Sequence, residues 1–425
     1  MPHPSLAGRD QSLTCYGQVM RGRWDNDRVS LGSQNVDTAV LRVDLDAVTE
    51  NAAFLQSCVG DAKIMAVVKA NAYGLGRTEV AAALQESGVT WFGVSHFNEA
   101  LALRRSFDDR GIPVEQARIF SWLGPTEASW AGVLEAGIDV SVSSLFQLQQ
   151  VRAAFDELEG GAEPARIHLK VDVGMGRGGV TTAELSELSA AILEAERAGD
   201  INLVGFWSHL PEADNPDHTV TNRQIDTFLE ARELVRSCGL NPELSHLSAT
   251  GGALWHPRAH FDLVRVGIGL YGLSPAPELA TSDQLGLKPA ATFTSRISQV
   301  KRLGPGQAVS YGGTWVADRP TWVGLLPVGY ADGVPRSLSS QATFHVLGED
   351  GATPARVLGR VCMDQVVIDL GDQEQPAAEV GQQVMLFGDP AEGFTSADDW
   401  AKMDDSINYE VISTLPAHLS RDYGK

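Results

Sequence analysis

From residue 46 to about residue 280, short apolar runs alternate with longer amphipathic segments. Segments such as 46–58, 181–199 and 221–239 carry apolar residues at three- and four-residue intervals, the spacing of a helix with one buried face. The apolar runs have the length of strands, and we predict eight: 63–69, 91–95, 117–122, 138–142, 165–172, 201–209, 244–249 and 261–267. Strands that alternate with helices indicate parallel strands joined by right-handed crossovers.

Eight strand–helix units within about 220 residues favour a (β/α)8 barrel of the TIM type. An open, doubly wound sheet has the same alternation, because periodicity alone does not show whether a sheet closes. The sequence therefore predicts an α/β fold with a barrel, and leaves the open sheet as the second interpretation.

The pattern changes after about residue 280. Apolar runs of strand length are interrupted by GPG, GYADG and EDG, and long helical patterns are scarce. This texture predicts a mostly antiparallel β domain over 281–425, following a barrel over 39–280. The first residues mix Pro, Gly, Ser, Asn and charge without a period, so we expect a flexible N-terminal extension over 1–38.

Length and charge narrow the range of functions. The 425 residues suggest two or three domains, and 43% hydrophobic residues are enough for a large core. Lys and Arg number 33 against 54 Asp and Glu, and the net charge of −21 argues against nucleic acid or an anionic membrane surface as a partner. No uninterrupted apolar run of about 18 residues occurs, so no transmembrane helix is expected.

Cysteine usage indicates the compartment. The four cysteines, Cys15, Cys58, Cys238 and Cys362, lie far apart and form no CxxC pair, which argues against a disulfide scaffold or a zinc ribbon. The N-terminal residues lack the apolar centre of a secretory signal. These features favour a cytoplasmic protein.

Polar side chains gather where the predicted strands end. In parallel barrels, the carboxyl ends of the strands meet on one face and carry the reactive groups. The polar residues at these ends are Lys69, Lys170 with Asp172, His209, Ser248 leading into Thr250, and Arg265.

Lys69 ends the apolar run IMAVVK. A lysine that emerges from apolar neighbours has a lowered pKa, so more of it is the neutral, nucleophilic amine. Such an amine can form a Schiff base with a carbonyl substrate or with pyridoxal phosphate. A strand-end lysine that extends to water has the same sequence context, so spacing alone leaves both interpretations open.

Two glycine pairs suggest an anion site. Gly251-Gly252 and Gly267-Ile268-Gly269 follow the last two predicted strands, where barrels often bind phosphate through backbone N–H groups. Arg177 in the glycine-rich stretch 170–179 could bind a carboxylate, or it could simply pair with Asp172.

The histidines leave several roles open. His209 and His246 fit bases, stacking groups or structural histidines. His209, Asp214 and His218 do not have a recognised metal spacing, so no metal site is expected.

Eight segments in order resemble the motifs of alanine racemases, and together they extend over nearly all of residues 40–415. They are AVVKANAYGLG (66–76), HLKVDVGMGRGG (168–179), SHLPEAD (208–214), RVGIGLYGLSP (265–275), VSYGGTW (309–315), GYADGVPR (329–336), GRVCMDQ (359–365) and INYE (407–410). The resemblance implies a cofactor-binding barrel, a C-terminal β domain that includes the strand at 39–45, and a head-to-tail homodimer with shared active sites.

The resemblance also implies the roles of individual residues. Lys69 resembles the lysine that forms the Schiff base with pyridoxal phosphate and acts as one of two bases, and Tyr311 the opposing base from the other subunit. By the same resemblance, the substrate carboxylate would be bound by Arg177 and Met363, and Lys170 corresponds to the often carbamylated lysine beside Arg177. The cofactor ring would contact His209 and Arg265, its phosphate would be held by Tyr73, Thr250, Gly267, Ile268 and Tyr409, and supporting roles fall to His246 and Asp364. The substrate entry corridor would be lined by Tyr330, Asp214, Arg336, Arg360 and Ile407.

The chain departs from the family pattern at several positions. These are Leu75 for histidine, Val173 for threonine, Gly178 for leucine, Ala249-Thr250 for Asn-Ser, and LPAHLSRDYGK for the usual Arg-Pro-Arg run near the C-terminus. None of them removes a catalytic group. The resemblance therefore implies a pyridoxal-phosphate-dependent racemase, with alanine as the expected substrate. A racemase for serine, lysine or many amino acids, a barrel-type decarboxylase and a non-catalytic cofactor-binding protein remain alternatives.

Overall fold

A computed structural model describes residues 37–158, 163–215 and 217–424 of the chain. The predicted N-terminal extension, 1–38, lies outside this part except for its last two residues. The chain from Thr38 onward forms one compact unit.

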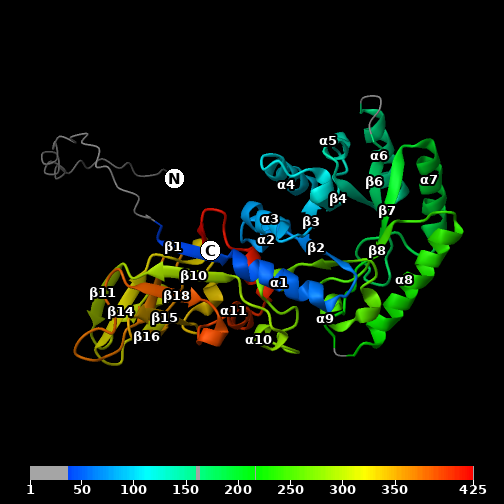
Figure 1. The fold of residues 1–425 in the computed structure, drawn as a ribbon. Helices are drawn as coiled ribbons and strands as arrows, with labels where there is room; N and C mark the ends of the chain where they lie inside the picture. The colour runs from blue at the N-terminus through cyan, green and yellow to red at the C-terminus, as the bar shows by residue number, and fades with distance from the viewer. Residues whose placement is uncertain (1–36, 159–162, 216, 425) are drawn as a thin grey trace, which may run out of the picture. The chain divides into compact units, whose positions relative to one another are not determined.

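Eight parallel strands form one sheet in the order β8-β7-β6-β5-β4-β3-β2-β9 (Figure 1). Their bounds are β2 (Lys63–Val67), β3 (Trp91–His96), β4 (Arg118–Leu123), β5 (Asp139–Val142), β6 (Ala165–Lys170), β7 (Ile201–Trp207), β8 (Leu244–His246) and β9 (Leu263–Val266). All eight predicted strands are present, although several end two or three residues earlier than predicted.

The sheet closes into a barrel where β8 meets β9. The Arg265 N–H donates to the Ser248 carbonyl at 2.9 Å, and the Asp262 N–H donates to the Ser245 carbonyl at 3.2 Å. From β2 to β8 each strand pairs with the next one in the chain, and β9 returns to pair with β2, as a barrel requires and the open, doubly wound order does not. The predicted barrel is thus confirmed over the open sheet.

Helices cover the outside of the barrel because each presents one apolar face. They are α1 (Leu45–Cys58), α3 (Arg77–Glu86), α4 (Phe97–Asp108), α5 (Ala131–Glu135), α6 (Leu145–Asp156), α7 (Leu185–Ala198), α8 (Thr219–Ser237) and α9 (Thr250–Trp255). In α7, for example, the buried residues are Leu185, Leu188, Ser189, Ile192 and Ala195, and Gly199 ends the helix in a left-handed conformation.

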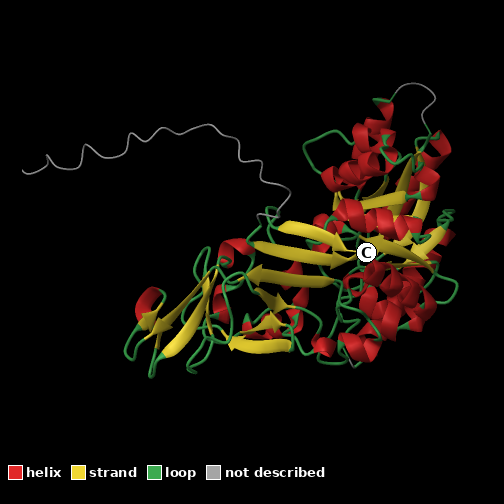
Figure 2. Ribbon diagram, turned by 60° about the vertical axis from the view of Figure 1, so that its left-hand side comes forward, coloured by secondary structure: helices red, strands yellow, loops and turns green. Residues whose placement is uncertain are grey.

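The C-terminal part of the chain is built on a six-stranded sheet in the order β16-β15-β18-β10-β1-β19 (Figure 2). Its strands are β1 (Ala39–Asp44), β10 (Ala291–Arg296), β15 (Thr343–Gly348), β16 (Gly351–Arg356), β18 (Gln383–Phe387) and β19 (Ser420–Gly424). All pairs are antiparallel except β1 with β19, so the strand that precedes the barrel lies inside this sheet.

Two smaller antiparallel sheets complete this part of the chain. One has the order β11-β14-β17, from β11 (Gln299–Leu303), β14 (Thr321–Leu326) and β17 (Val366–Asp369). The other pairs β12 (Ala308–Val309) with β13 (Trp315–Val316), and the 3-10 turn η4 (Tyr311–Gly313) connects these two strands. The short helices α11 (Ala397–Met403) and α12 (Asn408–Ser413) precede β19.

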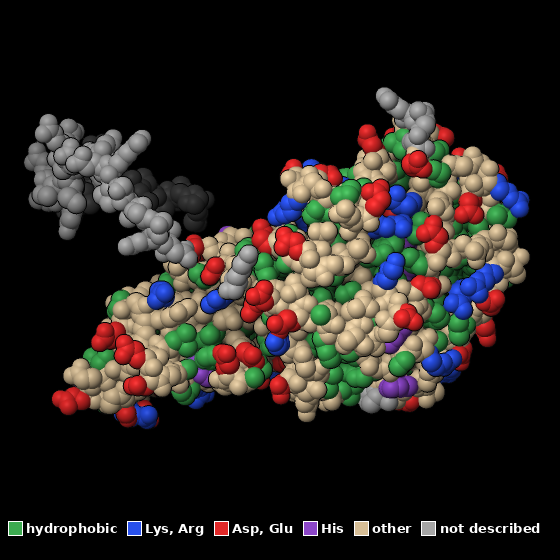
Figure 3. All heavy atoms as spheres, viewed as in Figure 1, with side chains coloured by type: hydrophobic (Ala, Val, Ile, Leu, Met, Phe, Trp, Pro, Cys, Tyr) green, Lys and Arg blue, Asp and Glu red, His purple; other side chains and the backbone are tan. Residues whose placement is uncertain are grey.

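Acidic side chains are spread over the visible face of both the barrel and the β-rich part, with basic side chains between them (Figure 3). Across the described residues, no helix combines the length and the apolar composition that a bilayer crossing needs.

Candidate active site

A cavity of about 480 Å³ opens at the carboxyl ends of the barrel strands. This size lies in the usual range for small-molecule sites. Ten of the predicted site residues line it: Lys69, Tyr73, Lys170, Arg177, His209, Thr250, Arg265, Gly267, Ile268 and Tyr409. The structure therefore brings together residues from positions as distant in the chain as Lys69 and Tyr409.

Lys69 lies just beyond its strand rather than at its end. β2 stops at Val67, and Lys69 begins the short turn α2 (Lys69–Tyr73). The predicted strand 63–69 was therefore two residues too long, because the backbone leaves the sheet after Val67. Four successive residues, 70–73, have φ between 49° and 56°, which makes α2 a left-handed turn. L-residues adopt this conformation at a cost of about 1–2 kcal/mol each, so surrounding contacts must hold it.

Glu99 supplies much of that support. Its Oε1 accepts a hydrogen bond from the Ala70 N–H at 2.7 Å and pairs with Arg77 Nη1 at 3.3 Å. Its Oε2 accepts from the N–H groups of Ser95 and His96, both at 3.2 Å, at the start of α4. One largely buried carboxylate thus ties the turn after Lys69 to the neighbouring strand β3.

The C-terminal strand supports the same segment from the other side. The Arg421 side chain donates to the Gly74 carbonyl at 2.7 Å. A Cβ at Gly76 would lie 1.8 Å from the Tyr423 hydroxyl, so this tyrosine fills the space that a side chain would need. Although the usual Arg-Pro-Arg run is absent, β19 still contacts the segment that carries Lys69.

The environment of Lys69 favours its neutral form. Burial lowers the pKa of Lys69, the Arg177 cation lowers it further, and the Glu99 carboxylate opposes part of the change. The amine is therefore a better nucleophile and base near neutral pH than an exposed lysine. Extension to water was the competing interpretation of the sequence, and the position of Lys69 on the cavity wall disfavours it.

Two loops meet at the predicted phosphate site. The Thr250 hydroxyl accepts a hydrogen bond from the Gly267 N–H at 3.1 Å, which joins the loop after β8 to the loop after β9. A Cβ at Gly267 would lie 2.4 Å from the Tyr73 hydroxyl, so glycine is required for this close approach. The result is a small cradle of two hydroxyls and a bare backbone.

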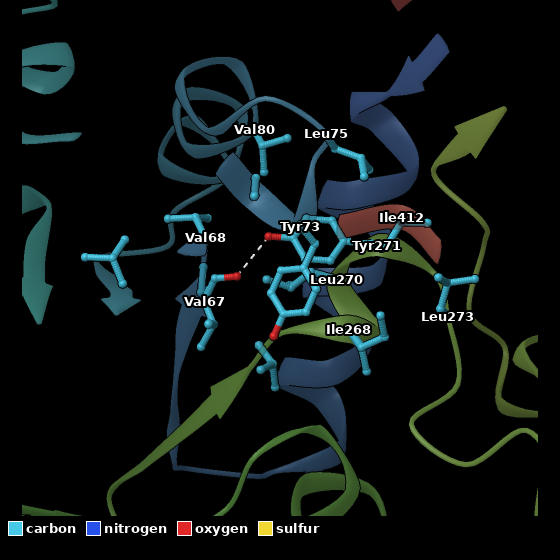
Figure 4. Close-up of a cluster of buried hydrophobic side chains, with 14 of the residues drawn as sticks. Val67, Val68, Tyr73, Leu75, Val80, Ile268, Leu270, Tyr271, Leu273 and Ile412 are labelled. Carbon is cyan, nitrogen blue, oxygen red and sulfur yellow. Dashed lines mark hydrogen bonds between the residues drawn. The ribbon is translucent and has the colours of Figure 1, made fainter. Parts of the chain in front are cut away.

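Aromatic packing fixes the Tyr73 side of this cradle (Figure 4). The Tyr73 ring lies 4.9 Å from Tyr271 and 6.2 Å from Tyr409, measured between centroids. The Tyr271 hydroxyl donates to the Val67 carbonyl at 2.8 Å, just before Lys69. Burial raises the pKa of Tyr73 and of Tyr409, so both hydroxyls remain protonated and can donate to an anion.

Arg265 is buried and held by two backbone carbonyls and two histidines. Its Nη2 donates to the carbonyls of Ser208 and Leu247 at 2.8 and 3.0 Å and faces His209 Nδ1 at 3.2 Å. Its Nη1 donates to His246 Nδ1 at 3.0 Å. Burial lowers the pKa of Arg265 to about 9, which still leaves the guanidinium charged at neutral pH.

His209 is neutral in this environment. Burial and the cations of Arg265, Arg177, Lys170 and Lys69 lower its pKa to about 3. A cationic acid is therefore a poorer interpretation than a neutral ring that accepts a hydrogen bond from Arg265. No cluster of three or more metal-ligating side chains occurs among the described residues.

The last residue of β6, Lys170, and the glycine-rich stretch that follows it contribute two cations. Lys170 Nζ lies 4.4 Å from the centroid of the Trp207 ring, and burial together with Arg265 and Arg177 lowers the pKa of Lys170 to about 8. The Asp172 carboxylate accepts hydrogen bonds from the N–H groups of residues 174, 175 and 176 at 2.8–3.0 Å. Asp172 thus shapes the loop, and Arg177 lies on the cavity wall.

Several predicted residues lie in the β-rich part and not in the lining of this cavity. Tyr311 begins η4 and is 73% exposed, and Met363 is 53% exposed next to the exposed Asp364. Residues 310 and 312, on either side of Tyr311, have positive φ, so the tyrosine sits on a tight turn. Tyr330 and Ile407, predicted for the entry corridor, are also exposed.

Sequence reasoning missed several residues of the site. Trp122, Leu123, Trp207 and Ser95 line the cavity at the ends of β4, β7 and β3. Applying the strand-end rule to aromatic as well as polar residues would have identified the two tryptophans. No sequence pattern identified Glu99, because it lies in the first turn of α4, whereas the Ala70 N–H that it accepts from follows a different strand, β2.

Models of two protein families match the chain: alanine racemase, N-terminal domain, over residues 43–275, and alanine racemase, C-terminal domain, over residues 290–423. The chain belongs to the alanine racemase family. The resemblance seen in the sequence motifs is thereby confirmed.

Similar proteins support the same assignment. An alanine racemase of Frankia casuarinae is 40% identical over 90% of this chain and 95% of its own length. One of Thermobifida fusca is 39% identical over 91% and 98%, respectively. The solved alanine racemase of Streptomyces lavendulae is 38% identical, with a TM-score of 0.85 over 92% of this chain and 98% of that one. An alanine racemase of Bacillus anthracis with bound L-Ala-P is 29% identical, with a TM-score of 0.80 over 92% and 96%.

Proposed function

We propose that this chain is a pyridoxal-phosphate-dependent racemase that interconverts L- and D-alanine. The observation that carries the proposal is the cavity in which a desolvated lysine, a charged arginine and a glycine cradle converge. The relatives are named alanine racemases, which favours alanine over serine, lysine or a broad set of substrates and disfavours a decarboxylase.

The residues of the cavity fit pyridoxal phosphate. The lowered pKa of Lys69 suits an amine that attacks an aldehyde. The cradle at Gly267, with the hydroxyls of Thr250 and Tyr73, suits a phosphate that approaches bare backbone. Arg265 and His209 would hold the ring end. When bound, the cofactor withdraws electrons from the substrate and makes its α-proton acidic.

Racemisation requires a proton acceptor on each face of the α-carbon. The Lys69 amine removes or returns the proton on one face, and its lowered pKa favours the accepting form. Tyr311 serves the opposite face. Arg177 holds the substrate carboxylate with a forked pair of N–H donors. Arg265 keeps its charge at neutral pH, so beside a bound cofactor it would disfavour a proton on the pyridine nitrogen and would favour proton return over transamination.

A second copy of the chain completes the site in this proposal. Tyr311 and Met363 are exposed and do not line the cavity of their own chain, as expected of residues that serve a partner. We infer a head-to-tail homodimer in which each β domain, 281–425, faces the barrel, 39–280, of the other subunit. The free thiols of Cys58, Cys238 and Cys362 suit the cytoplasm, where thiols remain reduced.

Two measurements test the function. Loss of optical rotation should occur with L-alanine and much more slowly with other amino acids. Borohydride reduction should leave the pyridoxyl group on the peptide that contains Lys69, and Lys69→Arg should abolish both signals. The matched control is Lys63→Arg, because Lys63 is an exposed lysine at the start of the strand that leads to Lys69. A label on another lysine, or rotation lost equally for all amino acids, would contradict the proposal.

A further inference from the structure

A chain of buried side chains runs from Arg265 through the inside of the barrel. Arg265 Nη1 lies 3.0 Å from His246 Nδ1, His246 Nε2 lies 2.8 Å from His168 Nδ1, and His168 Nε2 lies 3.2 Å from Asp139 Oδ2. His246, His168 and Asp139 have no exposed surface, and Arg265 is 5% exposed. The chain therefore joins the candidate active site to the middle of the fold.

Asp139 is anchored at the opposite end of the barrel. It is the first residue of β5, and its two oxygens pair with Arg118 Nη2 and Arg166 Nε, both at 2.6 Å. These arginines lie at the starts of β4 and β6 and are partly exposed. Burial alone would raise the pKa of Asp139, but the hydrogen bond from His168 and the charges of Arg118 and Arg166 outweigh it. Asp139 is therefore ionised.

The partners at the two ends fix the protonation of both histidines. A guanidinium only donates, so His246 Nδ1 must accept and the His246 proton must be on Nε2. That proton is donated to His168 Nδ1, so the His168 proton is also on Nε2. It is donated to Asp139, because an ionised carboxylate only accepts. All four ring nitrogens are then paired, and the hydrogen bonds run in a single direction.

The surroundings keep water and other partners away from the two rings. Phe120 stacks on His168 with centroids 4.3 Å apart, and Trp207 stacks on His246 at 5.5 Å. The strand β7 has a glycine at this point, and a Cβ at Gly205 would lie only 2.1 Å from His168 Nδ1, so no larger residue fits beside the ring. Burial lowers the pKa of His168 and of His246, which agrees with two neutral rings.

We propose that Asp139 and His168 are positioning residues that act on Arg265 through His246. The donor-only guanidinium of Arg265 and the acceptor-only carboxylate of Asp139 impose the same direction from the two ends of the chain, so that His246 presents a lone pair to the guanidinium and holds it in one orientation. An amide at position 139 could donate as well as accept, so that only the guanidinium would then oppose a change of tautomer in the two histidines. The effect on catalysis rests on the proposed racemase function, whereas the tautomers do not.

Three variants separate positioning from packing. Asp139→Asn removes the fixed direction, and His168→Phe interrupts the chain while leaving the pairs of Asp139 with Arg118 and Arg166 in place. Phe120→Leu is the matched control, because Phe120 packs against both rings without taking part in the hydrogen bonds. Circular dichroism and thermal unfolding of each variant report on folding.

Nitrogen-15 NMR of the imidazoles gives a readout that does not depend on activity. In the apoprotein and the holoprotein, both histidines should be neutral, with the proton on Nε2, across neutral pH. In Asp139→Asn, His246 should show a mixture of tautomers, while in Phe120→Leu it should keep the proton on Nε2. A wild-type His246 protonated on Nδ1 would overturn the proposed direction, whatever reaction the protein catalyses.

Kinetics tests the positioning role. Asp139→Asn and His168→Phe should each lower kcat for alanine by about 10-fold, the low end for loss of a supporting partner, with a smaller change in KM. Phe120→Leu should lower kcat by much less. Equal losses in all three variants would reject positioning. If wild-type protein shows the expected tautomers but no racemisation, the proposed function fails and the direction of the chain stands.

Discussion

At the scale of single residues, two charges of opposite sign act on the pKa of Lys69. Arg177 lowers its pKa and Glu99 raises it, on a background of burial that lowers it. Glu99 also holds the turn that follows Lys69 through the Ala70 N–H. Glu99 thus affects both the position and the basicity of the amine, although it was not predicted as part of the site.

Glu99→Gln should lower the pKa of Lys69 further, because the opposing negative charge is lost while an oxygen remains to accept the Ala70 N–H. Only the neutral amine attacks an aldehyde, so the rise in the rate of cofactor rebinding by apoenzyme should occur at lower pH than in wild type. The control is Glu86→Gln at the exposed end of α3. If the midpoint of the pH dependence of this rate stayed unchanged or moved to higher pH, the Glu99 charge would not affect the pKa of Lys69.

Arg265 should govern which reaction follows proton removal. Arg265→Glu replaces a permanent cation with a carboxylate that favours a proton on the pyridine nitrogen, so racemisation should slow and more pyruvate should form per racemisation turnover. Circular dichroism must accompany the assay, since Arg265 is buried and makes four hydrogen bonds. A well-folded variant with an unchanged ratio of pyruvate to racemised alanine would refute this role.

At the scale of elements, several residues of the candidate site lie on turns directly after a strand. In the sequence, these turns look like a continuation of the strand. The predicted strands 63–69, 165–172, 201–209 and 244–249 end in the structure at Val67, Lys170, Trp207 and His246, in that order. The excess residues, which include Lys69 and His209, leave the sheet and turn toward the cavity.

The limits of sequence prediction have a physical basis at this scale. Periodicity identified the eight strands because buried parallel strands need continuous apolar runs. It did not identify the left-handed turn after Lys69, because Glu99, Arg421 and Tyr423 support that segment from distant parts of the chain. The hydrogen-bonded chain over His246, His168 and Asp139 was hidden for the same reason: its members face one another only once the barrel has closed.

The left-handed turn allows a stability test. Ala70 is exposed with φ of 49°, so Ala70→Gly should raise the free energy of unfolding by up to about 1 kcal/mol by removing the Cβ penalty. Ala83→Gly in the right-handed helix α3 is the matched control, and it should lower that free energy by about 1 kcal/mol. Denaturant unfolding measures both variants. If Ala70→Gly were destabilising like the control, the turn would not be strained.

At the scale of the whole molecule, the proposed site draws on two copies of the chain. The barrel supplies Lys69 and most of the cavity wall, whereas Tyr311 lies exposed on the β-rich part. The motif around Tyr311 was visible in the sequence, but no periodicity can show which copy of the chain a residue serves. Tyr311 does not line the cavity of its own chain, and its side chain is exposed. These two observations together favour a site that a second subunit completes.

Mixing two inactive variants tests the shared site. Lys69→Ala lacks the lysine and Tyr311→Phe lacks the phenol, so each homodimer should be inactive. In a mixed dimer, the Tyr311→Phe barrel keeps Lys69 and receives an intact Tyr311 from its partner, while the other site lacks both groups. Random pairing makes about half of the dimers mixed, so about one quarter of all sites should become active.

The control is each variant unfolded and reassociated alone, which should stay inactive. A differently tagged pair, recovered through both tags, shows that mixed dimers have formed. If Lys69 and Tyr311 of one site came from the same chain, no pairing would unite them, and the mixture would remain as inactive as its parts. Recovered mixed dimers without activity would therefore reject the head-to-tail arrangement. Activity near one quarter of wild type in the unsorted mixture, or near one half in the recovered mixed dimers, would require it, because only exchange between subunits can place both bases in one site.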